Sequence, residues 1–212
     1  MALAAKSQGA HMGGSLSLVE IMAALYGGTM SFAPDAPQAE YRDRLILSKG
    51  HGVMAQYAAL KQVGLLSEDE LLTYKANGSY VSAHPSVNPG LGIDFASGSL
   101  GQGISQGVGV ALALYKKGNE SSRVFVILGD GEFDEGSVWE AAMTASHYRL
   151  ANIVAVIDRN RLQYDGNTEE VLALTDFSAK WKAFGWDVVT VDGHDVQALK
   201  EAFRMHTEKP LA

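Results

Sequence analysis

Two polar segments carry the residue types best suited to bind a metal ion. Gly129-Asp130-Gly131 follows an apolar run at 124–128, and Asn160 follows another at 153–157. Parallel α/β sheets bind ligands at the carboxyl ends of their strands, so both segments are expected at one edge of a sheet. Asp130 offers a carboxylate, Asn160 an amide oxygen and Leu162 a backbone carbonyl, and such oxygen ligands bind Mg²⁺ or Ca²⁺. The pair of segments therefore predicts a divalent cation bound to a diphosphate.

The Gly-Asp-Gly segment has other interpretations. Alone, it is equally typical of a strand-to-helix turn, where the helix dipole favours acidic residues. A dinucleotide site does not fit, because the spacing is not G-x-G-x-x-G and Asp130 would face a pyrophosphate unscreened. Gly101-Gln102-Gly103 is followed by Gly107, one residue too late for that motif, and there is no G-x-x-x-x-G-K-[ST] segment. These comparisons favour the metal–diphosphate interpretation.

Composition excludes several classes of protein. The chain has 212 residues, 47% of them hydrophobic, with 17 Lys and Arg against 24 Asp and Glu, a net charge of −7. This profile is typical of a folded globular protein, and its acidic balance argues against a nucleic-acid partner. There is no cysteine, so disulfides and thiolate chemistry are excluded. No apolar run approaches the length of a membrane span, and no signal peptide is recognisable, so we expect a cytoplasmic protein without a membrane partner.

The elements that must position these residues alternate along the chain. Apolar runs predict strands at 44–48, 124–128, 153–157 and 186–191. Apolar spacing predicts helices at 16–26, 52–63, 104–117, 137–148, 177–184 and 196–206, with a capping box at 67–70 starting another. Ser15 or Ser17 is the candidate N-cap of the first helix. The alternation predicts a three-layer α/β/α sandwich with a mainly parallel sheet.

Domain organisation is expected to be simple. We expect a single domain over residues 1–212, incomplete at both ends. Met1 to Gly9 resemble the end of a helix, and residues 208–212 lead into a further strand. The Gly/Ser/Pro-rich stretch at 77–103 predicts a long loop, and such loops within a compact domain are usually functional. The lysines and arginines are expected to be scattered surface charge.

The motifs together resemble one family. Gly129-Asp130-Gly131 followed by Asn160 resembles a thiamine-diphosphate motif, and the chain is similar to the N-terminal, diphosphate-binding domain of transketolase. Further matching segments follow in family order and are Ala10-His11-Met12-Gly13, Ser48-Lys49-Gly50-His51-Gly52, Ala83-His84-Pro85 and Gly98-Ser99-Leu100-Gly101-Gln102-Gly103. They extend over about three-quarters of the chain.

The resemblance implies roles for individual residues. Asp130, Asn160 and the carbonyl of Leu162 would bind Mg²⁺ or Ca²⁺ on thiamine diphosphate. Backbone groups of the Gly129 to Glu132 turn would contact the diphosphate, as would His51. Gly98 and Leu100 would line its rings. His11 and His84 would line the substrate channel and handle proton transfer or hydroxyl recognition. Glu135 and Glu140 would lie at a subunit interface, in a carboxylate network that couples paired sites. The catalytic residues implied are His11, His51, His84 and Glu135. His147, His194 and His206 match no family segment and are expected at the surface or in the core.

The implied activity is a transketolase reaction, in which a two-carbon ketol unit passes from a ketose phosphate to an aldose phosphate. The pyrimidine-binding domain of the family is not recognisable here, so the resemblance implies a dimer or heterotetramer with a separate C-terminal subunit. Two alternatives stay open. The chain could belong to another thiamine-diphosphate enzyme, deoxyxylulose-phosphate-synthase-like or a 2-oxo-acid dehydrogenase component, or it could be a non-catalytic assembly subunit.

Overall fold

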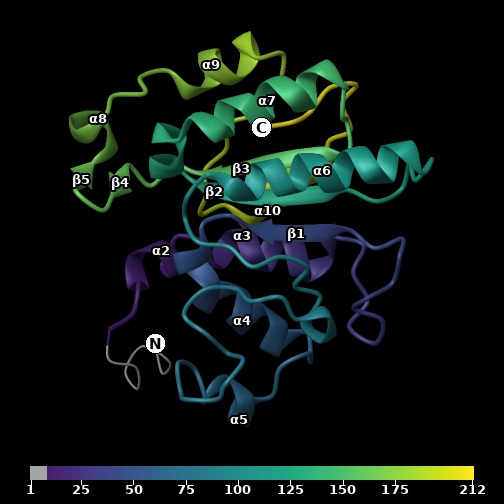
Figure 1. Cartoon of the computed structure of the whole chain (residues 1–212), viewed down its shortest axis with the longest axis vertical. Coiled ribbons are helices and arrows are strands. Elements are labelled where there is room, and N and C mark those ends of the chain that lie inside the picture. Colours follow the sequence, from purple (N-terminus) through teal and green to yellow (C-terminus); the bar gives the residue numbers. More distant parts are fainter. Residues whose placement is uncertain (1–8) are drawn as a thin grey trace.

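The computed structural model describes residues 9–212, in which a parallel sheet forms the centre of the molecule (Figure 1). Its strands are β1 (Arg44–Leu47), β2 (Val124–Gly129) and β3 (Ile153–Asp158), in the order β1-β2-β3. Leu47 pairs with Ile127, and Gly129 pairs with Asp158. The register brings the carboxyl ends of β2 and β3 level with each other.

Alternate strand residues face two separate hydrophobic cores. Leu45, Phe125 and Val154 belong to one core, whereas their neighbours along the strands, Ile46 and Val126, belong to the other. A strand buried on both faces needs a continuous apolar run, and this explains why the strands were recognisable in the sequence.

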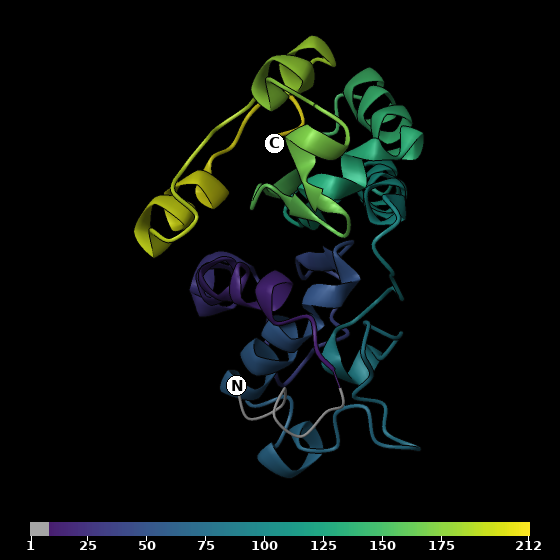
Figure 2. The ribbon, with the colours of Figure 1, turned by 90° about the vertical axis from the view of Figure 1, so that its left-hand side faces the viewer.

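Helices cover both faces of the sheet. The first core includes side chains of α3 (Val19–Ala24), α4 (Val53–Gln62) and α10 (Val196–Arg204). The second includes side chains of α6 (Gln102–Lys116), α7 (Gly136–His147) and α9 (Phe177–Ala183). Figures 1 and 2 show α10 beside α3, although most of the chain separates them in sequence. The expected α/β fold with a parallel sheet is confirmed.

Short elements occupy the connections. Those before α6 are α2 (Met12–Leu16), the π-helical turn η1 (Leu25–Thr29), η2 (Gly50–Gly52), α5 (Glu68–Leu71) and η3 (Pro89–Leu91). Those after β2 are η4 (Asp130–Asp134), the antiparallel pair β4 (Leu162–Gln163) and β5 (Gly166–Asn167), and α8 (Thr168–Val171). The expected capping box forms at Ser67 and Glu70. The loop predicted at 77–103 contains η3 and is otherwise irregular up to α6.

Three expectations about the elements were wrong in detail. The helix predicted at 16–26 is divided into α2 and α3, and neither candidate serine is an N-cap. Ser15 lies inside α2, Ser17 ends it, and Leu18 precedes α3. The Ser17 hydroxyl instead donates to Asp158 at 2.5 Å. Residues 186–191 form no strand, and Asp187 makes only an isolated bridge with Leu211, which also bridges Val154. The expectation for residues 1–9 lies outside the described residues, apart from Gly9.

An aromatic cluster fills the second core beside η4. Phe133 lies 5.5 Å from Trp139 and 5.7 Å from Trp181, measured between ring centroids, and Trp181 lies 4.6 Å from Trp186. The Trp139 indole N–H donates to the Phe133 carbonyl at 3.0 Å. Large buried aromatics contribute strongly to core stability, so this cluster fixes the turn that directly follows β2. Over residues 9–212, no helix is both long and apolar enough to cross a bilayer.

Candidate active site

A cavity of about 620 Å³ lies at the carboxyl ends of the strands. Nine of the expected site residues line it, namely His11, His51, His84, Gly129, Asp130, Gly131, Glu132, Asn160 and Leu162. Gly98 and Leu100 instead border a much smaller cavity, although Ser99 between them lines the large one. Glu135 and Glu140 are exposed and line neither. The fold thus gathers residues that lie far apart in the sequence.

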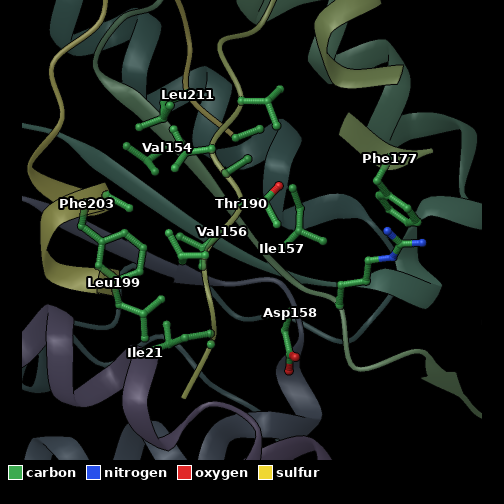
Figure 3. A pocket seen from close by; sticks show the side chains of 18 of the residues that line it. Ile21, Val154, Val156, Ile157, Asp158, Phe177, Thr190, Leu199, Phe203 and Leu211 are labelled. Atoms are coloured by element: carbon green, nitrogen blue, oxygen red, sulfur yellow. The ribbon is translucent and has the colours of Figure 1, made fainter. Parts of the chain in front are cut away.

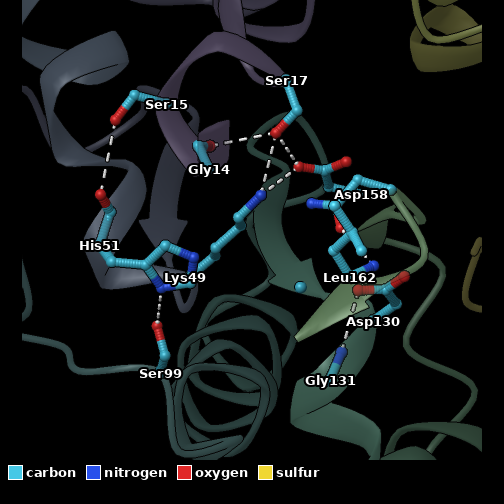
Figure 4. A network of polar contacts seen from close by, with 12 residues as sticks. Gly14, Ser15, Ser17, Lys49, His51, Ser99, Asp130, Gly131, Asp158 and Leu162 are labelled. Carbon is cyan, nitrogen blue, oxygen red and sulfur yellow. Dashed lines mark hydrogen bonds and ion pairs between the residues drawn. The ribbon is translucent and has the colours of Figure 1, made fainter. Parts of the chain in front are cut away.

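Asp130 joins the turn after β2 to the loop after β3. It is buried, and its carboxylate accepts the backbone N–H of Arg161 at 2.6 Å and that of Gly131 at 3.1 Å (Figure 4). Burial is the main cause that raises the pKa of Asp130. The amide oxygen of Asn160 accepts the Leu162 N–H at 2.9 Å. The hydrogen bond from Arg161 therefore links the segments that carry Asp130 and Asn160 directly.

These oxygen donors suit a hard divalent cation whose remaining ligands come from a phosphate. Asp130 and Asn160 supply two oxygens on one cavity wall. Within the described part of the chain, no group of three His, Cys, Asp or Glu residues could bind a metal ion. Cations such as Mg²⁺ commonly take one or two carboxylates and complete their coordination with substrate phosphates and water. The residues present suit that arrangement better than an all-protein metal site.

Three histidines meet on the opposite wall. The His11 ring lies 5.4 Å from the His51 ring and 6.4 Å from the His84 ring. His51 Nδ1 lies 2.6 Å from the Ser99 hydroxyl. Burial, together with the positive charge of Lys49 and the neighbouring histidines, lowers the pKa of His51 to about 4. His51 is therefore neutral near pH 7, where its ring can accept or donate a hydrogen bond without carrying charge.

Lys49 is the main residue that the sequence interpretation missed. Its side chain is only 1% exposed, which contradicts the expectation of scattered surface cations. The ammonium group forms an ion pair with Asp158 and donates to the Ser17 hydroxyl at 3.0 Å (Figure 4). Arg42, also buried, pairs with Asp94 at 2.6 Å. A useful signal was available, since only Ser48 separates Lys49 from the apolar run Leu45-Ile46-Leu47, where a surface cation is unusual.

Glu132 was expected to act through its backbone, but its side chain also makes contacts. The carboxylate is 4% exposed and accepts hydrogen bonds from the Ser48 hydroxyl at 2.6 Å, the Gly129 N–H at 2.8 Å and the Gly101 N–H at 3.0 Å. Burial raises the pKa of Glu132, and these hydrogen bonds oppose the rise.

A second cavity, of about 370 Å³, lies along the outer edge of β3 (Figure 3). Most of the lining residues labelled in Figure 3 are apolar, such as Ile21, Val156, Leu199 and Phe203, and Asp158 lies at one end. The first cavity is the better candidate for binding a phosphorylated ligand, because Asp130 and the three histidines line it and none of them lines the second.

Comparison with known proteins agrees with the geometry. A family profile described as "Transketolase, thiamine diphosphate binding domain" matches residues 1–210. The chain is 43% identical to one of the subunits of the apulose-4-phosphate transketolase of Phocaeicola vulgatus, over 94% of this chain and 70% of that protein. It is 44% identical to 6-deoxy-6-sulfo-D-fructose transketolase subunit SqwG of Clostridium sp., over 91% of this chain and 70% of that protein.

Solved structures show the same similarity. The crystal structure of a transketolase variant from Pichia stipitis matches with a TM-score of 0.89 and 32% identity, over 99% of this chain. The chain spans about a third of that protein, since the match covers 33% of its length.

Proposed function

Because the chain belongs to the transketolase family of thiamine-diphosphate-binding domains, we propose that it forms the diphosphate-binding half of a transketolase active site. The carrying observation is the cavity at the strand ends, where Asp130 and Asn160 face His11, His51 and His84. The reaction is the transfer of a two-carbon ketol unit from a ketose phosphate to an aldose phosphate. When bound, thiamine diphosphate supplies the nucleophilic carbon and the electron sink for this chemistry.

Each wall of the cavity has its own task in this proposal. Asp130, Asn160 and the carbonyl of Leu162 bind Mg²⁺ or Ca²⁺ on the diphosphate, and the backbone of the turn from Gly129 to Glu132 lies against the phosphates. A cation there offsets the repulsion between the Asp130 carboxylate and the phosphate oxygens. Gly98 and Leu100 contact the rings of the cofactor.

The histidine wall serves the sugar. His11 and His84 line the substrate channel, where they bind hydroxyl groups and move protons. His51, neutral near pH 7, contacts a phosphate oxygen or a substrate hydroxyl as a hydrogen-bond partner. The low pKa of His51 supports this assignment, because a neutral imidazole presents one donor and one acceptor.

The second half of the site comes from another subunit in this proposal. Two relatives are named as transketolase subunits, which supports a separate second subunit. The chain associates with a second copy of itself to form a dimer, which becomes a heterotetramer when C-terminal subunits bind. Glu135 and Glu140 lie at the interface. Leu100 and Met143, 59% and 52% exposed, offer apolar contacts for it. The chain has no cysteine and needs no oxidising compartment, which suits a cytoplasmic protein.

Calorimetric titration of thiamine diphosphate, with and without Mg²⁺, tests the proposal. Wild-type protein should bind in a metal-dependent manner, and Asp130→Asn should lose at least tenfold in affinity. Asp195→Asn is the matched control, because Asp195 caps α10 and Asn caps helices equally well. Equal metal-dependent binding by both variants would contradict the assignment of Asp130. Ketol transfer should appear only when the C-terminal subunit is added.

A further inference from the structure

One buried carboxylate connects three segments around the cavity. Glu132 lies in η4, and its two oxygens accept three hydrogen bonds. Oε1 accepts from the Ser48 hydroxyl and the Gly101 N–H, whereas Oε2 accepts from the Gly129 N–H. These donors come from the end of β1, from the loop before α6 and from the end of β2.

Each of the three segments continues directly into cavity-lining residues. Ser48 is followed by Lys49 and His51, Gly101 follows Ser99, and Gly129 precedes Asp130. The Ser48 hydroxyl also accepts the Gly103 N–H at 3.2 Å, which extends the connection to the first turn of α6. A shift of the Glu132 side chain would therefore break the hydrogen bonds that hold three cavity-lining segments in place.

The site requires a carboxylate and excludes an amide of the same size. The Gly101 and Gly129 N–H groups and the Ser48 hydroxyl all donate, and they reach both oxygens of Glu132. An amide has one accepting oxygen, so its NH₂ group would face at least one of these donors. A buried donor left without an acceptor is costly, and the affected segment would have to move.

The Gly101 segment depends strongly on this bond because its backbone is constrained. Gly101 has φ +66°, in the left-handed region that favours glycine. A Cβ there would lie 2.7 Å from Val138 and 3.0 Å from the Glu135 Cβ, so the backbone packs closely on α7. The Glu132 carboxylate supplies the acceptor for the N–H of this tightly packed residue.

We propose that Glu132 is a positioning residue, whose carboxylate sets the relative arrangement of the three segments that bind the cofactor. The inference deepens the proposed function and rests on it. Glu132 acts through Ser48, Gly101 and Gly129, in addition to any contact of its own backbone with phosphate. Its removal should weaken cofactor binding even where the fold persists.

The test combines two measurements on the same variants. Glu132→Gln retains the side-chain volume, and Asn119→Ala is the control. Asn119 is equally buried, and its amide oxygen accepts the backbone N–H groups of Ser121 and Ser122 just before β2, at the opposite end of that strand. The first measurement is the calorimetric affinity for thiamine diphosphate with Mg²⁺, well below the unfolding temperature. The second follows the amide resonances of Gly101 and Gly129 by NMR in the ligand-free protein.

We expect Glu132→Gln to lose at least tenfold in affinity and to shift both glycine amide resonances. Ser48→Ala, which leaves the carboxylate but removes one of its donors and the acceptor of the Gly103 N–H, should lose about threefold. Asn119→Ala should lower thermal stability while its affinity and both resonances stay at wild-type values. Shifted resonances with unchanged affinity would overturn the proposal, and so would unchanged resonances. A wild-type protein that binds no cofactor would instead overturn the proposed function, and the amide resonances would still decide whether Glu132 organises the segments.

Discussion

The buried ion pair between Lys49 and Asp158 gives the sharpest prediction about stability. Their side chains are 1% and 8% exposed, so removal of one partner leaves the other charge poorly solvated. Loss of one member of such a pair typically costs about 3–5 kcal/mol. Ser17 donates to Asp158 and would satisfy part of that carboxylate, which favours the lower half of this range. Lys49→Met should therefore reduce the free energy of unfolding by about 3 kcal/mol.

Urea unfolding followed by far-UV circular dichroism measures this loss. The matched control is Lys117→Met, because Lys117 and Glu40 pair at 3.5 Å with side chains that are 68% and 61% exposed. Exposed pairs contribute about 0–1 kcal/mol, so this variant should unfold almost like the wild type. The double variant Lys49→Met with Asp158→Asn should recover most of the loss, since no uncompensated charge remains. Equal effects of Lys49→Met and Lys117→Met would refute the reasoning.

Three further predictions concern the histidines and one glycine. His51 has a pKa lowered to about 4 from 6.5, so its NMR signals should not titrate between pH 6 and 8. As pH falls from about 6.5 towards 4, the unfolded chain takes up this proton first, and His51 should therefore lower stability over that window. Glu20→Gln should lower the pKa of His194, which the hydrogen bond to Glu20 raises, and NMR titration measures it. Gly101→Ala should cost more in thermal unfolding than Gly118→Ala, because both have positive φ but only the first meets neighbouring atoms. Equal costs would show that the packing on α7 is looser than described.

The parts of the fold that depend on local pattern were predictable from the sequence. The runs that form β2 and β3 are apolar on both faces, and a continuous apolar run is typical of a strand in a covered parallel sheet. The end of α2 at Ser17 was not predictable in the same way. The Ser17 hydroxyl donates a hydrogen bond to Asp158, which is distant in sequence. Tertiary contacts of this kind override local helix signals.

Some residues of the candidate site were likewise predictable from local motifs, whereas others depend on tertiary contacts. Asp130, Asn160 and the three histidines were identified from motifs and line one cavity. Strand topology explains why Asp130 and Asn160 share it, because they follow the neighbouring strands β2 and β3. Lys49 was not identified, because a lysine is usually exposed and its burial depends on a partner that only the fold supplies. The Glu132 side chain escaped notice for the same reason, since its donors come from three separate segments.

All three tryptophans of the chain lie over one face of the sheet, around Phe133 in the turn that carries Asp130 and Glu132. Tryptophan fluorescence therefore reports only on the layer that contains the second core. The opposite core holds tyrosines such as Tyr57 and contains no indole. Fluorescence and circular dichroism should then give separate transitions if the two layers ever melt independently, and a quenching change on ligand addition would be a signal from the turn itself.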